Sequence, residues 1–143
     1  PLLMRKAADV TITGETTNNY FGQSLIAGDF NADGKIDLAV GARGYSTNTG
    51  RAYLFYNDGS IPTTAATADV TMNGETTSNA FGRSLAIGDL NADGNMDLVV
   101  GAYSYSTSTG RTYVITAEAK VESQAGVRAR GTTTIRGSFL MKR

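Results

Sequence analysis

The sequence predicts an all-β protein made of two repeated sheets, each with four short antiparallel strands. Residues 9–54 align with residues 69–114 without a gap, and 30 of the 46 aligned positions are identical. The chain contains 17 Gly, 2 Pro and many Ser and Thr residues, which favours tight turns over long helices. A repeat of 60 residues is typical of blades or solenoid units that are too small to bury their own apolar faces.

The strand candidates follow from the local patterns within each unit. Residues 9–13 and 51–56 alternate between polar and apolar side chains, and residues 46–50 form a turn before the latter segment. Residues 24–28 and 37–41 are short and apolar and are bounded by Gly, which suits inner strands packed on both faces. The second unit repeats these segments at residues 69–73, 84–88, 97–101 and 111–115. Four strands per unit are the content of a propeller blade. A sandwich has a similar number of strands but would not naturally give two near-identical successive units.

An acidic loop joins the second and third strand candidates of each unit, at residues 29–37 and 89–97. Each loop has oxygen-bearing side chains at positions 1, 3, 5 and 9 and Gly at position 6. Such a loop can wrap a hard cation, because alternate side chains point inward, the carbonyl of position 7 can join them, and Gly permits the sharp turn. The chain has no His or Cys, and a donor set made only of oxygen favours calcium over zinc or copper.

Two other structures share parts of this loop pattern. Ala-Asp-Gly alone is an ordinary hairpin turn signal. An EF-hand needs flanking helices and a bidentate Glu at loop position 12, where this chain has Val40 and Val100. Two copies in register, each with a fourth carboxylate after two further residues, favour a cation loop within a β-hairpin.

Phe21-Gly22 and Phe81-Gly82 precede the acidic loops, and Gly41-Ala42 and Gly101-Ala102 follow them. Taken in this order, twice, these motifs and loops resemble the FG-GAP repeat over about residues 9–115. The FG-GAP repeat forms the β-propeller of integrin α subunits, and related propellers occur in bacterial surface proteins and some fungal lectins. The resemblance implies that each loop joins the first two strands of a blade and binds calcium. The implied ligands are Asp29, Asn31, Asp33, the carbonyl of Lys35 and Asp37 in the first loop, and Asp89, Asn91, Asp93, the carbonyl of Asn95 and Asp97 in the second.

One departure from the family pattern follows the Gly-Ala step. The family has Pro at the next position, where this chain has Arg43 and Tyr103. We expect a modest change in the following turn and no loss of metal binding.

The predicted organisation is an N-terminal segment (residues 1–8), a first repeat (9–68), a second repeat (69–128) and a C-terminal edge strand with a tail (129–143). Residues 132–137 resemble residues 9–14 and predict a third copy of the edge strand, so one strand is spare. Propellers of this family close with about seven blades, and two blades leave apolar faces open.

Because a spare edge strand pairs readily with another chain, we expect one of two arrangements. The chain forms a head-to-tail homo-oligomer, as a ring or a filament, or it is part of a longer propeller. The alternative is a truncated piece in which residues 116–143 are disordered.

Catalysis is not expected. Without His or Cys, the Ser-His-Asp and Cys-His mechanisms are excluded, and the sequence has no phosphate-binding Gly-rich motif. Three pairs of polar or aromatic residues recur in both repeats, and we interpret them as structural and not catalytic. Glu15 and Glu75 are predicted to be solvated surface, Arg51 and Arg111 to pair with a loop carboxylate or carbonyl, and Tyr45 and Tyr105 to pack beneath a turn.

The predicted function is a calcium-binding module in extracellular adhesion, protein interaction or self-assembly, and the alternative is a propeller lectin that binds a glycan. Weak calcium sites suit the cell surface or exterior, where calcium is millimolar. Six cations after residue 118, without interleaved aromatic residues, do not indicate nucleic-acid binding. No apolar run approaches 18 residues, so no membrane span is expected.

Overall fold

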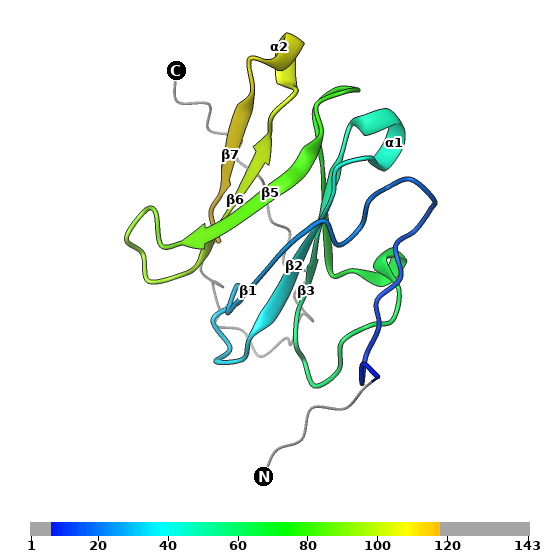
Figure 1. Cartoon of the computed structure of the whole chain (residues 1–143). Coiled ribbons are helices and arrows are strands. Elements are labelled where there is room, and N and C mark those ends of the chain that lie inside the picture. The colour runs from blue at the N-terminus through cyan, green and yellow to red at the C-terminus, as the bar shows by residue number, and fades with distance from the viewer. Residues whose placement is uncertain (1–6, 118–143) are drawn as a thin grey trace, which may run out of the picture.

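The computed structural model describes residues 7–117, which form two antiparallel sheets packed face to face (Figure 1). The first sheet has the strand order β1-β2-β3-β4, and the second has the order β5-β6-β7. The strands of the first sheet are β1 (Ser24–Gly28), β2 (Asp37–Ala42), β3 (Arg51–Phe55) and β4 (Val70–Asn73). Those of the second are β5 (Phe81–Gly88), β6 (Asp97–Ala102) and β7 (Arg111–Ile115). The all-β class and the blade-like antiparallel sheets are therefore confirmed.

Three short helical elements lie between the strands. They are α1 (Tyr45–Asn48), η1 (Ala65–Thr67) and α2 (Tyr105–Ser108). The predicted turn at residues 46–50 is thus partly helical, but Ser46 and Thr47 have left-handed φ values of 46° and 56°. The Thr49 hydroxyl donates a hydrogen bond of 2.7 Å to the Ser46 carbonyl and holds the turn closed. Within residues 7–117, no helix is long and apolar enough to span a membrane.

The sheets are offset from the sequence repeats. β4 belongs to the second repeat, yet it pairs with β3 of the first, with Met72 opposite Ala52. Its counterpart at residues 9–13, expected as the first strand of the first sheet, forms no regular strand, and only Thr13 makes a β-bridge, to Thr64. The first sheet therefore takes its outer strand from the second repeat. The second sheet has three strands within residues 7–117, and the predicted strand at 132–137 lies outside the described residues.

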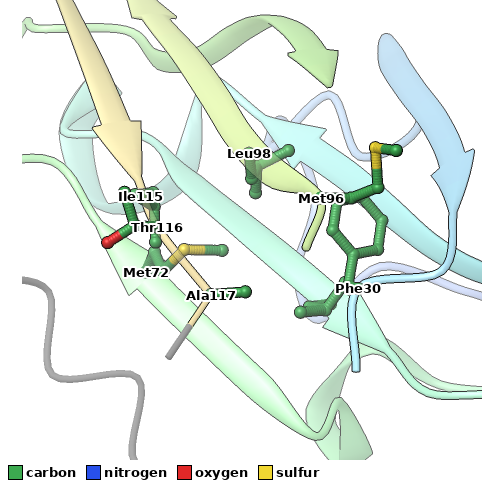
Figure 2. A pocket seen from close by; sticks show the side chains of 8 residues that line it. Phe30, Met72, Met96, Leu98, Ile115, Thr116 and Ala117 are labelled. Carbon is green, nitrogen blue, oxygen red and sulfur yellow. The ribbon is translucent and has the colours of Figure 1, made fainter. Parts of the chain in front are cut away.

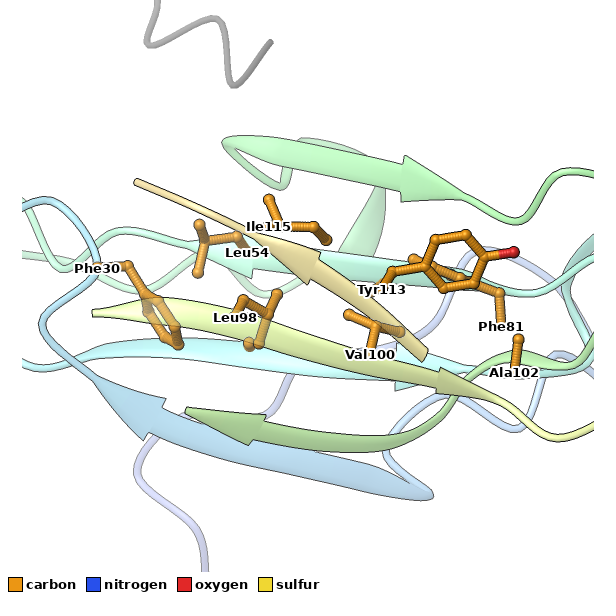
Figure 3. Packing of buried hydrophobic residues seen from close by; sticks show 10 residues of the cluster. Phe30, Leu54, Phe81, Leu98, Val100, Ala102, Tyr113 and Ile115 are labelled. Carbon is orange, nitrogen blue, oxygen red and sulfur yellow. The ribbon is translucent and has the colours of Figure 1, made fainter. Parts of the chain in front are cut away.

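The main hydrophobic core lies between the two sheets (Figure 3). Because side chains alternate along a strand, every second residue of β3 points into this core, and Leu54 is only 2% exposed there. Opposite it lie Leu98, Val100 and Ile115 of the second sheet. Phe30, from the first acidic loop, also enters this core and is 6% exposed. The loop is thus attached to the packing of the two sheets.

The opposite face of the first sheet, called here its outer face, carries a second cluster that includes Val40, Tyr53 and Phe55. Ile12 and Phe21 from the segment before β1 pack against it. The corresponding outer face of the second sheet carries Ala86, Val99 and Val114, which lie side by side in the strand register. Val114 is exposed, and Val99 is half-buried.

The packing accounts for the Phe-Gly and Gly-Ala motifs. Phe21 and Phe81 each lie edge-on to a buried tyrosine, with ring centroids 5.3 Å from Tyr53 and 5.1 Å from Tyr113. Such edge-to-face pairs contribute beyond the apolar area that they bury. Gly41 lets the sheets approach, because a Cβ atom at this position would collide with the carbonyl oxygen of Gly82.

Replacement of Leu54 tests the core between the sheets. Leu54→Ala should lower the free energy of unfolding by about 2–5 kcal/mol, because it leaves a cavity in a packed core. Leu54→Met keeps the volume and should cost less than about 1.5 kcal/mol. Urea denaturation of both variants at one protein concentration measures the difference. Equal losses for the two variants would show that the side chain is not tightly packed between the sheets.

Candidate metal loops and the paired arginines

Each acidic loop closes the hairpin between the first two strands of its sheet. The first follows Gly28 and ends at Asp37, which are opposite each other in the β1–β2 register. Position 6 is the predicted glycine turn, with φ values of 83° at Gly34 and 87° at Gly94. Position 4 is also left-handed, with φ values of 56° at Ala32 and 60° at Ala92. No residue in the sequence indicated this second turn, because Ala rarely adopts such a conformation.

The first three oxygen donors of the first loop gather around the backbone of Asp33. Its N–H donates to both Asp29 Oδ1 and Asn31 Oδ1, at 3.1 Å each. The other oxygen of Asp29 accepts from the Gly34 N–H at 2.9 Å, and Asp33 Oδ1 accepts from the Lys35 N–H at 2.8 Å. Because the oxygens of Asp29 and Asn31 share one donor, they converge on the same side of the loop.

The second loop has the same arrangement. The Asp93 N–H donates to Asp89 Oδ1 at 3.1 Å and to Asn91 Oδ1 at 3.0 Å. Asp93 Oδ1 accepts from the backbone N–H of Asn95 at 2.8 Å and also from its side-chain amide at 3.0 Å. The Asn95 N–H, followed by the Asn91 side chain, lowers the pKa of the Asp93 carboxyl below its usual value. Asp93 therefore stays ionised at neutral pH, as a calcium ligand must.

The carboxylate at position 9 differs from the others because it is buried. Asp37 is 1% exposed and Asp97 is 0% exposed. Asp37 Oδ2 accepts from the Phe30 N–H at 2.9 Å, and Oδ1 accepts from the Asn57 N–H at 2.8 Å. Asp97 makes the equivalent bonds to the N–H groups of Leu90 and Ala117, at 2.8 and 3.2 Å. This residue thus joins the start of its loop to the segment that follows the third strand, a role that the sequence did not reveal.

The chemistry of the donors fits calcium. All of them are carboxylate, amide or carbonyl oxygens, and Asp29, Asn31 and Asp33 are accessible in an exposed loop. Within residues 7–117, no three acidic side chains form a compact group of the kind that binds a metal with carboxylates alone. An ion here would therefore need the amide of Asn31 and the backbone carbonyl at position 7 as well. The roles of all ten predicted residues as calcium ligands stay predictions.

The repeated arginines form a second kind of cluster, away from the acidic loops. The Arg51 guanidinium contacts Glu15 at 2.8 Å and lies 3.7 Å above the centre of the Tyr45 ring. Its Nε also donates to Asn73 Oδ1 at 2.6 Å, across the β3–β4 pair. The prediction that Glu15 is solvated surface is therefore wrong, because its side chain is only 23% exposed. The predictions that Arg51 pairs with a carboxylate and that Tyr45 packs beneath the turn are confirmed.

The second repeat has the same cluster. Arg111 contacts Glu75 at 2.8 Å and lies 3.6 Å above the Tyr105 ring. Unlike Glu15, Glu75 lies at an exposed position, with its side chain 34% exposed, so the surface position predicted for it is confirmed. Burial, together with the neighbouring Glu75, raises the pKa of Tyr113 to about 12. These groups are held in fixed pairs, which suits a structural role better than proton transfer.

A small apolar pocket opens at the edge of the core between the sheets (Figure 2). Thr116 is its only lining residue with a polar side chain. No acidic, basic or amide side chain is among its lining residues. The lining residues are Phe30, Leu54, Met72, Met96, Leu98, Ile115, Thr116 and Ala117.

A double-mutant cycle on Glu15 and Arg51 tests whether the pair stabilises the fold. We expect a coupling free energy of about 1 kcal/mol from Glu15→Ala, Arg51→Ala and the double variant, because the pair is partly buried. The same cycle on Glu75 and Arg111 is the matched comparison and should give a smaller value, since both side chains are more exposed. Strictly additive losses at the first pair would contradict a stabilising interaction.

Comparisons with known proteins agree with this geometry. The FG-GAP repeat matches residues 21–55 and 81–115. Phosphatidylinositol-glycan-specific phospholipase D of Bos taurus is 40% identical over 106 residues, which are 65% of this chain and 13% of the phospholipase. Integrin alpha-IIb of Mus musculus is 35% identical over 111 residues, which are 71% of this chain and 11% of the integrin. Integrin alpha-7 of Homo sapiens is 38% identical over 103 residues, or 68% of this chain and 8% of that protein.

The chain thus spans only 8–13% of the length of these relatives, so the similarity concerns one region of each. The two matched segments coincide with the two acidic hairpins and the strands around them. This chain therefore carries two FG-GAP repeats and folds as blades of the integrin α type.

Proposed function

We propose that this chain is a calcium-binding, non-catalytic module that mediates protein interaction outside the cell. The observation that carries the proposal is the convergence of oxygen donors in two equivalent loops. In each loop, one backbone N–H holds an Asp and an Asn oxygen toward the same point, at 3.0–3.1 Å. Two separate loops with the same arrangement are better explained if each loop binds the same kind of ligand than if both are ordinary turns.

The calcium ion would stabilise the hairpin rather than take part in a reaction. The acidic side chains of each loop repel one another, and a divalent cation removes that repulsion. Asp37 links the ordered loop to the rest of the sheet, because its hydrogen bonds to the N–H groups of Phe30 and Asn57 connect the loop to the core and to the segment after β3. At about 1 mM free calcium and a dissociation constant near 0.1 mM, each site adds roughly 1.4 kcal/mol of stability.

This affinity range points to an extracellular location. Loops with few charged ligands bind calcium at about 10⁻⁴–10⁻³ M in extracellular modules. In a cytosol with sub-micromolar calcium, such sites would be mostly empty and would contribute no stability. The similarity to integrin alpha chains supports the same location and a role in adhesion.

A protein ligand is favoured over a glycan by the environment of the repeated tyrosines. Tyr45 and Tyr105 are each covered by an arginine on one ring face, so that this face is closed to a sugar. The exposed tyrosines, Tyr20 and Tyr103, are replaced by Ala80 and Arg43 in the other repeat. The two blades therefore lack a shared aromatic platform for sugar stacking.

Calcium titration tests this function. Isothermal titration calorimetry of the chain should find two sites, and Asp33→Asn or Asp93→Asn should each weaken one of them. Calcium at millimolar concentration should raise the midpoint of thermal unfolding by several degrees, because each occupied site adds stability.

Asp58→Asn is the matched control, since Asp58 is exposed in a turn outside both loops, and it should leave both sites intact. If neither heat nor a thermal shift appears at saturating calcium, the loops are ordinary turns. Glycan-array binding that survives removal of calcium would favour the lectin alternative.

A further inference from the structure

Apolar residues on the outer face of the second sheet are the repeat equivalents of residues buried in the core. Val114 is 46% exposed, whereas its equivalent Leu54 is 2% exposed between the sheets. Leu90 is 59% exposed, and its equivalent Phe30 is 6% exposed. The first sheet buries this surface against the second sheet, but nothing within residues 7–117 covers the same surface on the second sheet.

The outer face of the first sheet also exposes an apolar residue whose repeat equivalent packs between the sheets. Leu25 is 64% exposed, whereas its equivalent Leu85 is half-buried against the core between the sheets. Val10, in the segment before β1, is 52% exposed, whereas its equivalent Val70, in β4, packs against the same core. On the outer face of the first sheet, Val40, Tyr53 and Phe55 are already buried beneath Ile12, Phe21 and Ala65. The part of this face that stays open lies at β1, around Leu25, and there it presents the surface that the second sheet uses to cover the first. The molecule carries both halves of its own sheet–sheet contact, on opposite sides.

We propose that the chain assembles head to tail with copies of itself through a repeat of this contact. Residues 10–14 of one copy add to β7 of the next as an antiparallel fourth strand. The outer face of the second sheet of one copy then covers the outer face of the first sheet of its neighbour. This assembly rests on the repeat geometry and does not depend on the proposed calcium binding.

The β3–β4 pair fixes the register of the added strand. Within the chain, Ala52 is opposite Met72 and Leu54 is opposite Val70. A shift of one repeat places Thr112 opposite Ile12, and Val114 opposite Val10, of the next copy. The Gly74 N–H donates to the Gly50 carbonyl at 2.9 Å, so the equivalent bond would join Gly14 to Gly110.

The backbone of residues 10–14 is already oriented for this pairing. The Thr13 N–H donates to the Thr63 carbonyl at 3.0 Å, and the Thr13 carbonyl accepts from the Ala65 N–H at 2.8 Å. Backbone groups of adjacent residues in an extended segment point to opposite sides. The groups of Ile12 and Gly14 therefore face away from residues 63–65, toward the side where β7 of another copy would lie.

The acceptor edge is equally available within the described residues. β7 pairs with β6 on one side and has no strand on the other within residues 7–117. In the first sheet, Gly50 bonds to Gly74, so every second residue of β3 after Gly50, which means Ala52 and Leu54, points its backbone groups toward β4. The repeat equivalents of these two residues are Thr112 and Val114, whose backbone groups therefore point to the open edge of β7. An open edge of this kind is a template for strand addition.

A side-chain hydrogen bond between the two sheets of one chain would also recur between copies. The Ser24 hydroxyl donates to the Gly82 carbonyl at 2.6 Å between the sheets. The equivalent pair is Ser84 of one copy and Gly22 of its neighbour. Because each copy contributes two sheets, a closed ring must contain an even number of blades. Three or four copies would supply about six or eight blades, within the range of known propellers, and a rotation that does not close would give a filament.

The test measures the solution mass of the full chain by light scattering in millimolar calcium. A chain of 15.0 kDa should give a well-defined multiple of that mass. Val10→Glu and Val114→Lys should each lower the association constant by about tenfold or more, since each places a charge in an apolar contact. The double variant Val10→Glu/Val114→Lys should recover most of the association, because the proposed register puts Glu and Lys directly opposite each other.

The like-charged variant Val10→Lys/Val114→Lys is the matched control and should stay dissociated. Both positions are exposed in the single chain, so the variants should fold, and circular dichroism checks this. Calorimetry on the same variants measures calcium binding separately, so that loss of assembly and loss of metal binding are distinguished.

A monomeric wild-type chain overturns the proposal, as does equal recovery by the opposite-charged and like-charged double variants. A monomer that associates only after deletion of residues 118–143 would assign the β7 edge to the tail of the same chain, which also overturns pairing with a second copy.

Discussion

The structure depends on the contact between two sheets that cannot bury their apolar faces alone. β4 supplies the outer strand of the first sheet from the second repeat, and the second sheet then covers the face that this strand completes. Strand pairing and face-to-face packing are therefore coupled at one junction. Met72 shows this coupling directly, since it lies opposite Ala52 in the first sheet and packs against the core shared with the second. A repeat of this kind is stable only next to another repeat.

The buried carboxylate of each acidic loop connects the loop to this junction. Asp37 accepts N–H groups from Phe30 and Asn57, and the Phe30 ring enters the core between the sheets. A buried charge is costly unless it is fully hydrogen-bonded, so these bonds fix the position of the loop. An ion bound by the exposed donors would thus act on the packing of the sheets through a few short contacts. Binding of the ion would therefore contribute directly to the stability of the blade.

Local patterns predicted the strands and the loops well, whereas contacts between distant residues were harder to foresee. β1 and β7 have the predicted bounds, because an apolar run bounded by glycine and an alternating segment after a turn are both local signals. The assignment of β4 to the first sheet was missed, since periodicity does not say which neighbour an edge strand joins. The pairing of Glu15 with Arg51 spans 36 residues and has no local signature. The left-handed Ala32 and Ala92 were also missed, because nothing in the side chain of Ala indicates that conformation.

The offset between the sheets and the sequence repeats has a consequence for how such genes can change in length. The junction that the structure describes joins β3 of the first repeat to β4 of the second. Because the repeats align at a constant spacing of 60 residues, a duplication or deletion of one 60-residue unit keeps this strand register wherever its breakpoints fall. Unequal recombination can therefore add or remove whole blades without creating a mismatched contact between sheets.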